Sequence, residues 1–300
     1  MAREISLRPV SHQTGELQPK SLTVVCGARR TGTTLLAAIL SSDPSTPPLP
    51  GEAQLVPRWL EEYRWALEDF EIRALPFFDD VEALRDFFRR NLSRFLAHCH
   101  QQFFPATSLV LKSPEISLYF PEALELLPEA RFVVITRDPR DQVASEWRIQ
   151  QQRVAERVAD ARERIIVRAH LYSRVARNYV RYYDPILGTR PDHGDRVLFI
   201  RYEDLVENPE AILAQLSDFT GLDLSSYSPT EKWPSVADSY WACGDRPGDT
   251  PQYGNAMEPR RVGAHAQTMS SRAAARVQQI CSSTVDQLDA EIETARISPA

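Results

Sequence analysis

The chain has 300 residues, of which 43% are hydrophobic and 25% charged, a composition typical of a globular protein with a sizeable core. The formal net charge of −6 argues against general nucleic-acid binding, although it leaves room for a local basic pocket. No stretch approaches about 20 consecutive apolar residues, so we expect neither a membrane-spanning helix nor a membrane partner.

Residues 1–20 form a polar lead-in without the apolar core of a signal peptide. The cysteines Cys26, Cys99, Cys243 and Cys281 lie far apart and form no CxxC or Cys/His cluster. We therefore expect free thiols, no metal site and a cytoplasmic protein.

Short apolar runs that alternate with helical segments predict an α/β fold with a parallel sheet covered by helices on both faces. Strands are expected at residues 21–26, 108–111, 131–136 and 196–200. Helices are expected at residues 35–40, 51–70, 80–104, 118–127, 162–183, 209–220 and 270–294, with another after residue 137. In the second of these helices, Pro57 marks a kink or a later start. Residues 225–268 are rich in Pro, Gly, Ser and Asp and are predicted to form a functional lid.

A glycine-containing loop, GARRTGTT, begins at Gly27 between the first strand and the first helix. Its two glycines let successive backbone amides converge on an anion, and the following helix adds the partial positive charge of its N-terminus. The spacing matches the P-loop GxxxxGK[ST], except that Thr33 stands where the P-loop has Lys. That Lys contacts the β- and γ-phosphates of nucleoside triphosphates. Its absence argues against a kinase and leaves an anion cradle with Arg29 and Arg30.

A second polar motif, RDPRDQVAS, begins at Arg137, directly after the third strand. Open α/β sheets bind ligands at the carboxyl ends of their strands. Arg137, together with Ser145 about two helical turns later, is therefore placed to hold a second phosphate. The alternative is a local salt bridge between Arg137 and Asp138, with no role for Ser145. A Walker B interpretation of FVVITRD is disfavoured, because an Arg precedes Asp138.

Together these motifs resemble the PAPS-dependent sulfotransferase superfamily in its bacterial-type form. GARRTGTTLL is similar to its 5′-phosphosulfate loop, FVVITRDPRDQVAS to its 3′-phosphate motif, and VLFIRYEDLVENPEAILAQLSDFTGL to the strand–helix unit that follows. The resemblance covers about residues 20–222. It implies a single sulfotransferase domain over residues 21–300, with a P-loop-like sheet flanked by helices. It also implies 3′-phosphoadenosine-5′-phosphosulfate (PAPS) as donor, adenosine 3′,5′-bisphosphate as product, and no required metal.

The resemblance also assigns residues to the donor. Arg137 and Ser145 would hold the 3′-phosphate, and Tyr202 would lie near the adenosine. Family members often place a Ser-Lys or basic run near an RVG-like turn in the lid, but PRRVGAHAQTMS has no Lys there. Either Arg260 or Arg261 substitutes, or the contact is missing. The residues implied on the 5′-phosphosulfate side are Arg29, Arg30, Thr31, Gly32, Thr33 and Thr34.

Sulfuryl transfer needs a base for the acceptor hydroxyl and positive charge near the leaving oxygen. In the cytosolic small-molecule branch the base is a His soon after the second strand, but here Pro114 stands about there. The tyrosylprotein sulfotransferase branch has a Gly-Glu pair, which PGEAQLVPRWL resembles, and a Lys ending the next strand. The resemblance therefore implies Glu52 as base and Lys112 as the group that assists the sulfuryl transfer. The alternatives are a helix N-terminal role for Glu52, and Glu115 or a His as base.

The expected acceptor is a hydroxyl compound, a phenol or alcohol, on a small molecule or a peptide. Trp59, Tyr63 and Trp65 on the helix after Glu52 favour an apolar or aromatic acceptor, although core packing explains them equally well. Two other hypotheses remain open. A non-catalytic nucleotide-binding protein with this fold is favoured by the missing lid Lys, and a small-molecule kinase is disfavoured by Thr33.

Overall fold

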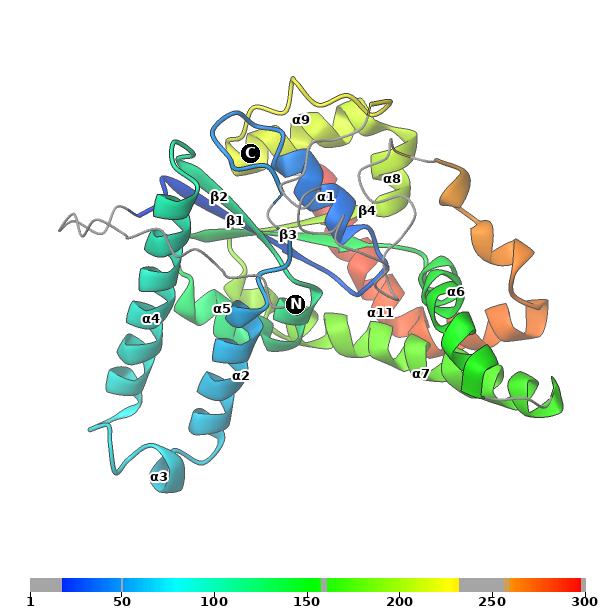
Figure 1. The fold of residues 1–300 in the computed structure, drawn as a ribbon, viewed down its shortest axis with the longest axis horizontal. Coiled ribbons are helices and arrows are strands. Elements are labelled where there is room, and N and C mark those ends of the chain that lie inside the picture. The colour runs from blue at the N-terminus through cyan, green and yellow to red at the C-terminus, as the bar shows by residue number, and fades with distance from the viewer. Residues whose placement is uncertain (1–17, 50, 158–160, 232–256, 258, 298–300) are drawn as a thin grey trace, which may run out of the picture.

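A parallel sheet forms the centre of the fold (Figure 1). The computed structural model describes residues 18–49, 51–157, 161–231, 257 and 259–297. The strands of this sheet are β1 (Ser21–Cys26), β2 (Ser108–Lys112), β3 (Ala130–Thr136) and β4 (Val197–Arg201), in the spatial order β2-β1-β3-β4. Val25 is in register with Lys112, and Thr136 with Arg201, so the strands end at one edge. The predicted α/β fold is confirmed.

A layer of helices covers each face of the sheet, which explains why the strands are apolar on both sides (Figure 1). One layer shares a core with Val25 and Val133, and the other with Val24 and Phe132. The first layer contains α1 (Thr33–Leu40), α8 (Tyr202–Glu207) and α9 (Pro209–Thr220). The second contains α2 (Leu55–Glu68), α4 (Val81–Gln102), α5 (Phe120–Leu126), α6 (Pro139–Arg157), α7 (Ala161–Gly188) and α11 (Ser271–Ile297).

The helix expected from residue 51 begins only at Leu55, so Glu52 precedes α2 and does not open it. Two backbone features explain the later start. Gly51 has a φ of 102°, outside the helical region. Pro57 falls in the first turn of α2, where its missing amide hydrogen is not needed. The helix N-terminal role considered for Glu52 is therefore wrong.

Helices α2 and α4 form a hairpin through the short α3 (Phe70–Arg73), and this hairpin projects from the body of the fold (Figure 1). Of its aromatic side chains, Tyr63 and Trp59 pack within it, whereas Trp65 is 51% exposed. Tyr63 is fully buried, and the rings of Trp59 and Phe95 meet edge to face with centroids 5.3 Å apart. Arg73 stacks over Trp65 at 4.7 Å. Tyr63 and Trp59 thus match the core-packing alternative, the exposed Trp65 does not, and an aromatic acceptor stays a prediction.

Other differences from the expected elements concern the segments before α5, after β4 and at the end of α7. A 3-10 helix, η1 (Pro114–Tyr119), precedes α5, and α8 directly follows β4. Helix α7 continues through Pro185 to Gly188 and is followed by a second 3-10 turn, η2 (Arg190–Asp192). None of the described helices is both long and apolar enough to cross a membrane.

The predicted lid and lead-in lie partly outside the described residues, which leave out 1–17, 232–256 and 258. The described end of the lid contains two 3-10 turns, η3 (Pro259–Arg261) and η4 (Ala264–Gln267). It is followed by Met269, which is 7% exposed and belongs to the core shared with α7 and α11. The polar segment before α11 is therefore fixed to the main body at that point.

The close contact between Gly27 and β3 generates a stability prediction. A Cβ at Gly27 would lie 2.5 Å from the carbonyl oxygen of Ile135, and the backbone there has a φ of +139°. We expect Gly27→Ala to lower the free energy of unfolding by about 3 kcal/mol, from strain and overpacking together. Gly188→Ala is the matched control, because a Cβ at Gly188 would have nothing within 4 Å. Urea unfolding should place the control within about 0.5 kcal/mol of wild type. Equal stability of both variants would contradict the contact.

Candidate functional site

The predicted site residues gather where the strands of the sheet end. The loop that begins at Gly27 follows β1, and Lys112 is the last residue of β2. Arg137 follows β3, and Tyr202 follows β4. The strands are parallel and in register, so residues far apart in sequence lie at the same edge of the sheet.

Side chains from other elements hold the glycine-containing loop in place. The amide of Gly27 donates to Ser117 Oγ at 2.8 Å, and the amide of Ala28 donates to the hydroxyl of Tyr183 at 3.2 Å. That hydroxyl donates in turn to the carbonyl of Ile135 at 2.7 Å. The periodicity of α7 identifies Tyr183 only as a core residue. Its polar role depends on a carbonyl 48 residues away in sequence.

Gly32 lets the loop pack directly against the predicted adenosine-side residue. It is the N-cap of α1 with a φ of 102°, and a Cβ there would lie 2.7 Å from Cδ2 of Tyr202. Thr33, at the P-loop Lys position, begins α1 and is 4% exposed. Thr31 uses its hydroxyl within the loop, donating to the carbonyl of Ala28 at 2.7 Å. Thr34 is half-buried in the first turn of α1.

Arginines from three parts of the chain lie beside this loop. Arg30 has a φ of 71° and points its Nε towards Ser145 Oγ at 3.4 Å. Burial lowers the pKa of Arg30, and the charges of Arg261 and Arg137 lower it further, although Glu146 opposes them. Such a concentration of positive charge favours an anionic ligand. The structure thus brings together Arg30, Arg137, Ser145 and Arg261.

Arg137 is buried and aimed across the site. Its guanidinium carbon lies 4.3 Å from the ring centroid of Tyr202, and Nη2 donates to the carbonyl of Arg261 at 2.7 Å. Its Nε is buried and has no hydrogen-bond partner among the described residues. Asp138 pairs instead with Arg140, whose Nε lies 3.0 Å from Oδ1. The alternative of a local salt bridge between Arg137 and Asp138 is therefore wrong.

Glu52 and Lys112 form an ion pair on the β2 side of the loop. Lys112 Nζ donates to Glu52 Oε1 at 2.5 Å, and the lysine is 5% exposed. Burial lowers the pKa of Lys112, and the Glu52 carboxylate opposes that shift, while the charge of Arg30 adds to it. Glu52 Oε2 accepts from the side-chain amide of Gln54 at 2.5 Å. The pair therefore lies within the electrostatic reach of the guanidinium cluster.

Glu115, the alternative base, is engaged elsewhere. Arg29 Nε donates to its Oε1 at 2.8 Å, and Ser113 Oγ donates to its Oε2 at 2.9 Å. Burial acts to raise the pKa of Glu115, but these bonds leave it below its ordinary value. Burial also raises the pKa of Tyr182, beside Arg29, to about 12. Arg29 therefore faces Glu115, and its side chain is 59% exposed, unlike that of Arg30.

Two histidines, His98 and His100, lie on α4, whereas a third, His265, lies beside the guanidinium cluster. His98 is exposed on α4, and His100 is buried on the same helix. The ring of His265 contacts Asp141, with 2.8 Å between Nδ1 and Oδ1. Arg260, the other lid arginine, is exposed in η3.

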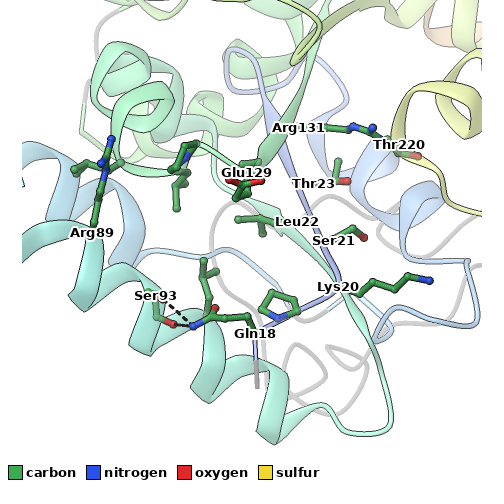
Figure 2. Close-up of a pocket in the computed structure, with 16 residues that line it drawn as sticks. Gln18, Lys20, Ser21, Leu22, Thr23, Arg89, Ser93, Glu129, Arg131 and Thr220 are labelled. Carbon is green, nitrogen blue, oxygen red and sulfur yellow. Dashed lines mark hydrogen bonds between the residues drawn. The ribbon is translucent and has the colours of Figure 1, made fainter. Parts of the chain in front are cut away.

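No group of three or more His, Cys, Asp or Glu side chains among the described residues is arranged to hold a metal ion. A pocket of about 550 Å³ does occur at the opposite edge of the sheet, where β1 and β3 begin. Figure 2 shows Lys20, Arg89 and Arg131 around it, with Gln18 bonded to Ser93. It contains none of the predicted site residues and is separate from the site.

Residues 23–226 match the model of the sulfotransferase family. The chain belongs to this family. The predicted superfamily and enzyme class are thereby confirmed, and the match includes Arg30, Lys112 and Arg137, although it ends before Arg261. A search of curated protein sequences found no match.

The fold is similar to that of the sulfotransferase domain of the olefin synthase from Synechococcus PCC 7002. The TM-score is 0.52 and the identity 19%, over 89% of this chain and 95% of that domain. For sulfotransferase STF9 from Mycobacterium avium, the TM-score is 0.46 and the identity 16%, over 90% of this chain and 76% of that chain. For retinol dehydratase in a complex with retinol and PAP, the TM-score is 0.46 and the identity 14%, over 91% of this chain and 82% of that chain. At these identities the first comparison establishes the shared fold alone.

The burial of Lys112 generates a prediction about stability and pH. Glu52→Gln removes the only carboxylate whose side chain is bonded to Lys112 among the described residues. We expect it to cost roughly 2–3 kcal/mol of unfolding free energy at pH 7. Lys112→Met should cost less, because Glu52 is 29% exposed and can be hydrated.

The loss of unfolding free energy in Glu52→Gln should become smaller as the pH rises. In that variant the pKa of Lys112 falls further below its ordinary value, because the opposing carboxylate is gone. Between the folded and unfolded pKa values the unfolded chain binds more protons, so stability rises with pH. Urea unfolding from pH 7 to 10 measures this. A deficit that stays constant or grows would contradict the assignment.

Proposed function

We propose that the protein transfers a sulfuryl group from PAPS to a hydroxyl group of a small molecule or peptide. One observation carries this proposal. The buried guanidinium of Arg137, whose Nε has no partner among the described residues, converges with Arg30, Ser145 and Arg261 beside an ion pair of Glu52 and Lys112. The cluster fits a phosphate, and the adjacent pair fits proton transfer.

The residues present fit the two phosphate ends of the donor. Arg137, Ser145 and Arg261 would hold the 3′-phosphate, because a planar guanidinium matches phosphate oxygens bidentately. The amides of the loop and the N-terminus of α1 would hold the 5′-phosphosulfate. Tyr202 would provide a ring against which the adenosine packs, next to Gly32. The unpartnered Arg137 Nε is the atom that a phosphate oxygen would satisfy.

PAPS would supply the sulfuryl group, whose bond to the 5′-phosphate oxygen breaks as the acceptor oxygen bonds to sulfur. Glu52 would take the proton of the acceptor hydroxyl on Oε2, after the side-chain amide of Gln54 moves away. Lys112 would keep Glu52 oriented through Oε1 and place positive charge where the leaving oxygen gains negative charge. Glu115 is less suited to this role, because its bonds to Arg29 hold its pKa below the ordinary value although burial opposes that shift.

Donor binding is the direct test of this proposal. We expect adenosine 3′,5′-bisphosphate to stabilise the protein against heat far more than ATP with magnesium does, because no P-loop Lys is present. A ligand at about 100 times its dissociation constant stabilises by roughly 2.7 kcal/mol. Arg137→Ala should lose most of this response. Equal or greater stabilisation by ATP with magnesium would favour the kinase alternative. Chelation of metal ions with EDTA should leave the rate of sulfuryl transfer unchanged.

The roles of Glu52 and Lys112 are tested by turnover with labelled PAPS and a panel of phenols. We expect Glu52→Gln to lower kcat by about 100- to 10,000-fold, because it removes the base. The dissociation constant of the bisphosphate should barely change. Lys112→Ala should also slow turnover strongly, and Lys112→Arg should restore little of it, because a planar fork does not replace a compact ammonium.

Glu61→Gln is the control for these variants. Glu61 lies on the surface of α2, where it pairs with Arg58, and its loss should leave turnover unchanged. Assays belong at a temperature where Glu52→Gln remains folded, since the variant is expected to be less stable. Turnover of Glu52→Gln near the wild-type value, with the bisphosphate still bound, would place the base elsewhere. Complete absence of turnover in the wild type, with the bisphosphate bound, would favour the non-catalytic alternative.

A further inference from the structure

Asp141, in the first turn of α6, is a buried carboxylate to which the sequence motif assigns no role. Its side chain is only 1% exposed. A carboxylate at such a depth is costly unless its oxygens accept several hydrogen bonds. The N-terminal position on α6 helps, because the helix dipole favours negative charge there. The remaining stabilisation comes from a segment more than 120 residues away in sequence.

Three donors from that segment converge on Asp141. The amide of Gly263 lies 2.7 Å from Oδ2, and the amide of His265 lies 2.8 Å from Oδ1. The ring Nδ1 of His265 is also 2.8 Å from Oδ1. Gly263 has a φ of +73°, and a Cβ there would have nothing within 4 Å, so the glycine is required by backbone conformation and not by space. This conformation directs the two amides towards one anion, as in other anion-binding turns.

The same segment carries Arg261 to the guanidinium cluster. The carbonyl of Arg261 accepts from Arg137 Nη2 at 2.7 Å, and Arg137 Nη2 lies 3.9 Å from Asp141 Oδ2. The charge of Arg261 in turn acts on Arg30. Asp141 therefore bonds to the backbone of Gly263 and His265, just after Arg261. It also lies beside Arg137, which donates to the carbonyl of Arg261.

We infer that Asp141 is a positioning residue, which fixes residues 261–265 against α6 so that Arg261 and Arg137 face the same phosphate. This inference rests on the proposed donor, and it concerns the 3′-phosphate only. Asp141 itself is an anion and does not touch the ligand. Its effect is to hold like-charged guanidinium groups together before the phosphate arrives, which lowers the cost of ordering them on binding.

The test compares two ligands on two variants by titration calorimetry. Asp141→Asn replaces one acceptor oxygen with an amide that cannot accept from the backbone donors. We expect it to weaken adenosine 3′,5′-bisphosphate by about 10- to 100-fold. Adenosine 5′-monophosphate, which lacks the 3′-phosphate, should lose less than about 2-fold. The ratio of the two dissociation constants is a readout that a merely structural role would not move.

Glu122→Gln is the matched control, because Glu122 is a buried carboxylate with a bidentate Arg64 partner far from the cluster. It should lower stability but leave both dissociation constants unchanged. His265→Ala removes one of the three bonds and is the second variant if Asp141→Asn does not fold. We expect it to weaken the bisphosphate by about 3- to 10-fold. If Asp141→Asn is folded and the ratio of the two dissociation constants is unchanged, whether neither ligand or both lose affinity equally, the inference is overturned.

Amide hydrogen exchange separates this inference from the proposed function. In the wild-type protein without ligand, the amides of Gly263 and His265 should be protected, and Asp141→Asn should expose them. If the wild type does not bind the bisphosphate, the donor assignment fails while the exchange data still report on the attachment. Unprotected amides at both positions in the wild type would overturn the attachment itself.

Discussion

The hydroxyl of Tyr183 joins the two strands on which the site is built. It donates to the carbonyl of Ile135 at the end of β3 and accepts from the amide of Ala28 just after β1. Its neighbour one turn earlier, Tyr179, donates to the carbonyl of Arg137 at 3.1 Å. Backbone groups at the ends of parallel strands have no ladder partners, and burying them unpaired is costly. The two phenols of α7 satisfy these groups, and the loop and Arg137 keep their positions as a result.

The site is an arrangement of charges that is partly balanced without any ligand. Arg30, Arg137 and Arg261 carry like charges within a small space, and Asp141 and Glu146 offset part of them. The buried positive charge of Lys112 is compensated by its ion pair with Glu52. Such preorganisation allows a polyanion to bind without first reordering the protein.

The sequence predicted the sheet and most helices because buried parallel strands are short apolar runs between clear helical periods. It led us to expect phosphate ligands at the carboxyl ends of these strands, where Arg30, Arg137 and Ser145 do lie together. It misplaced the start of α2, because the backbone conformation of Gly51 and the N-terminal tolerance of helices for Pro57 are not visible in a hydrophobic pattern. It implied Arg29 as a phosphate ligand, a role that stays a prediction, and the arginine pairs with Glu115 on η1. The polar roles of Tyr183 and Asp141 could not be predicted, because their partners lie 48 and more than 120 residues away.

The order of the strands also constrains how the chain assembles. β1 comes first in the chain among the four described strands, yet it lies between β2 and β3, and its loop is bonded to Tyr183, 155 residues later. During synthesis β1 therefore has two unpaired edges until residues 108–136 have appeared, and the last bonds to α6 form only when Gly263 and His265 emerge. Non-local pairings of this kind close long loops before they gain stability, so they fold slowly. A ribosome-bound chain that stops before residue 261 would contain all four described strands but would lack Arg261 of the guanidinium cluster.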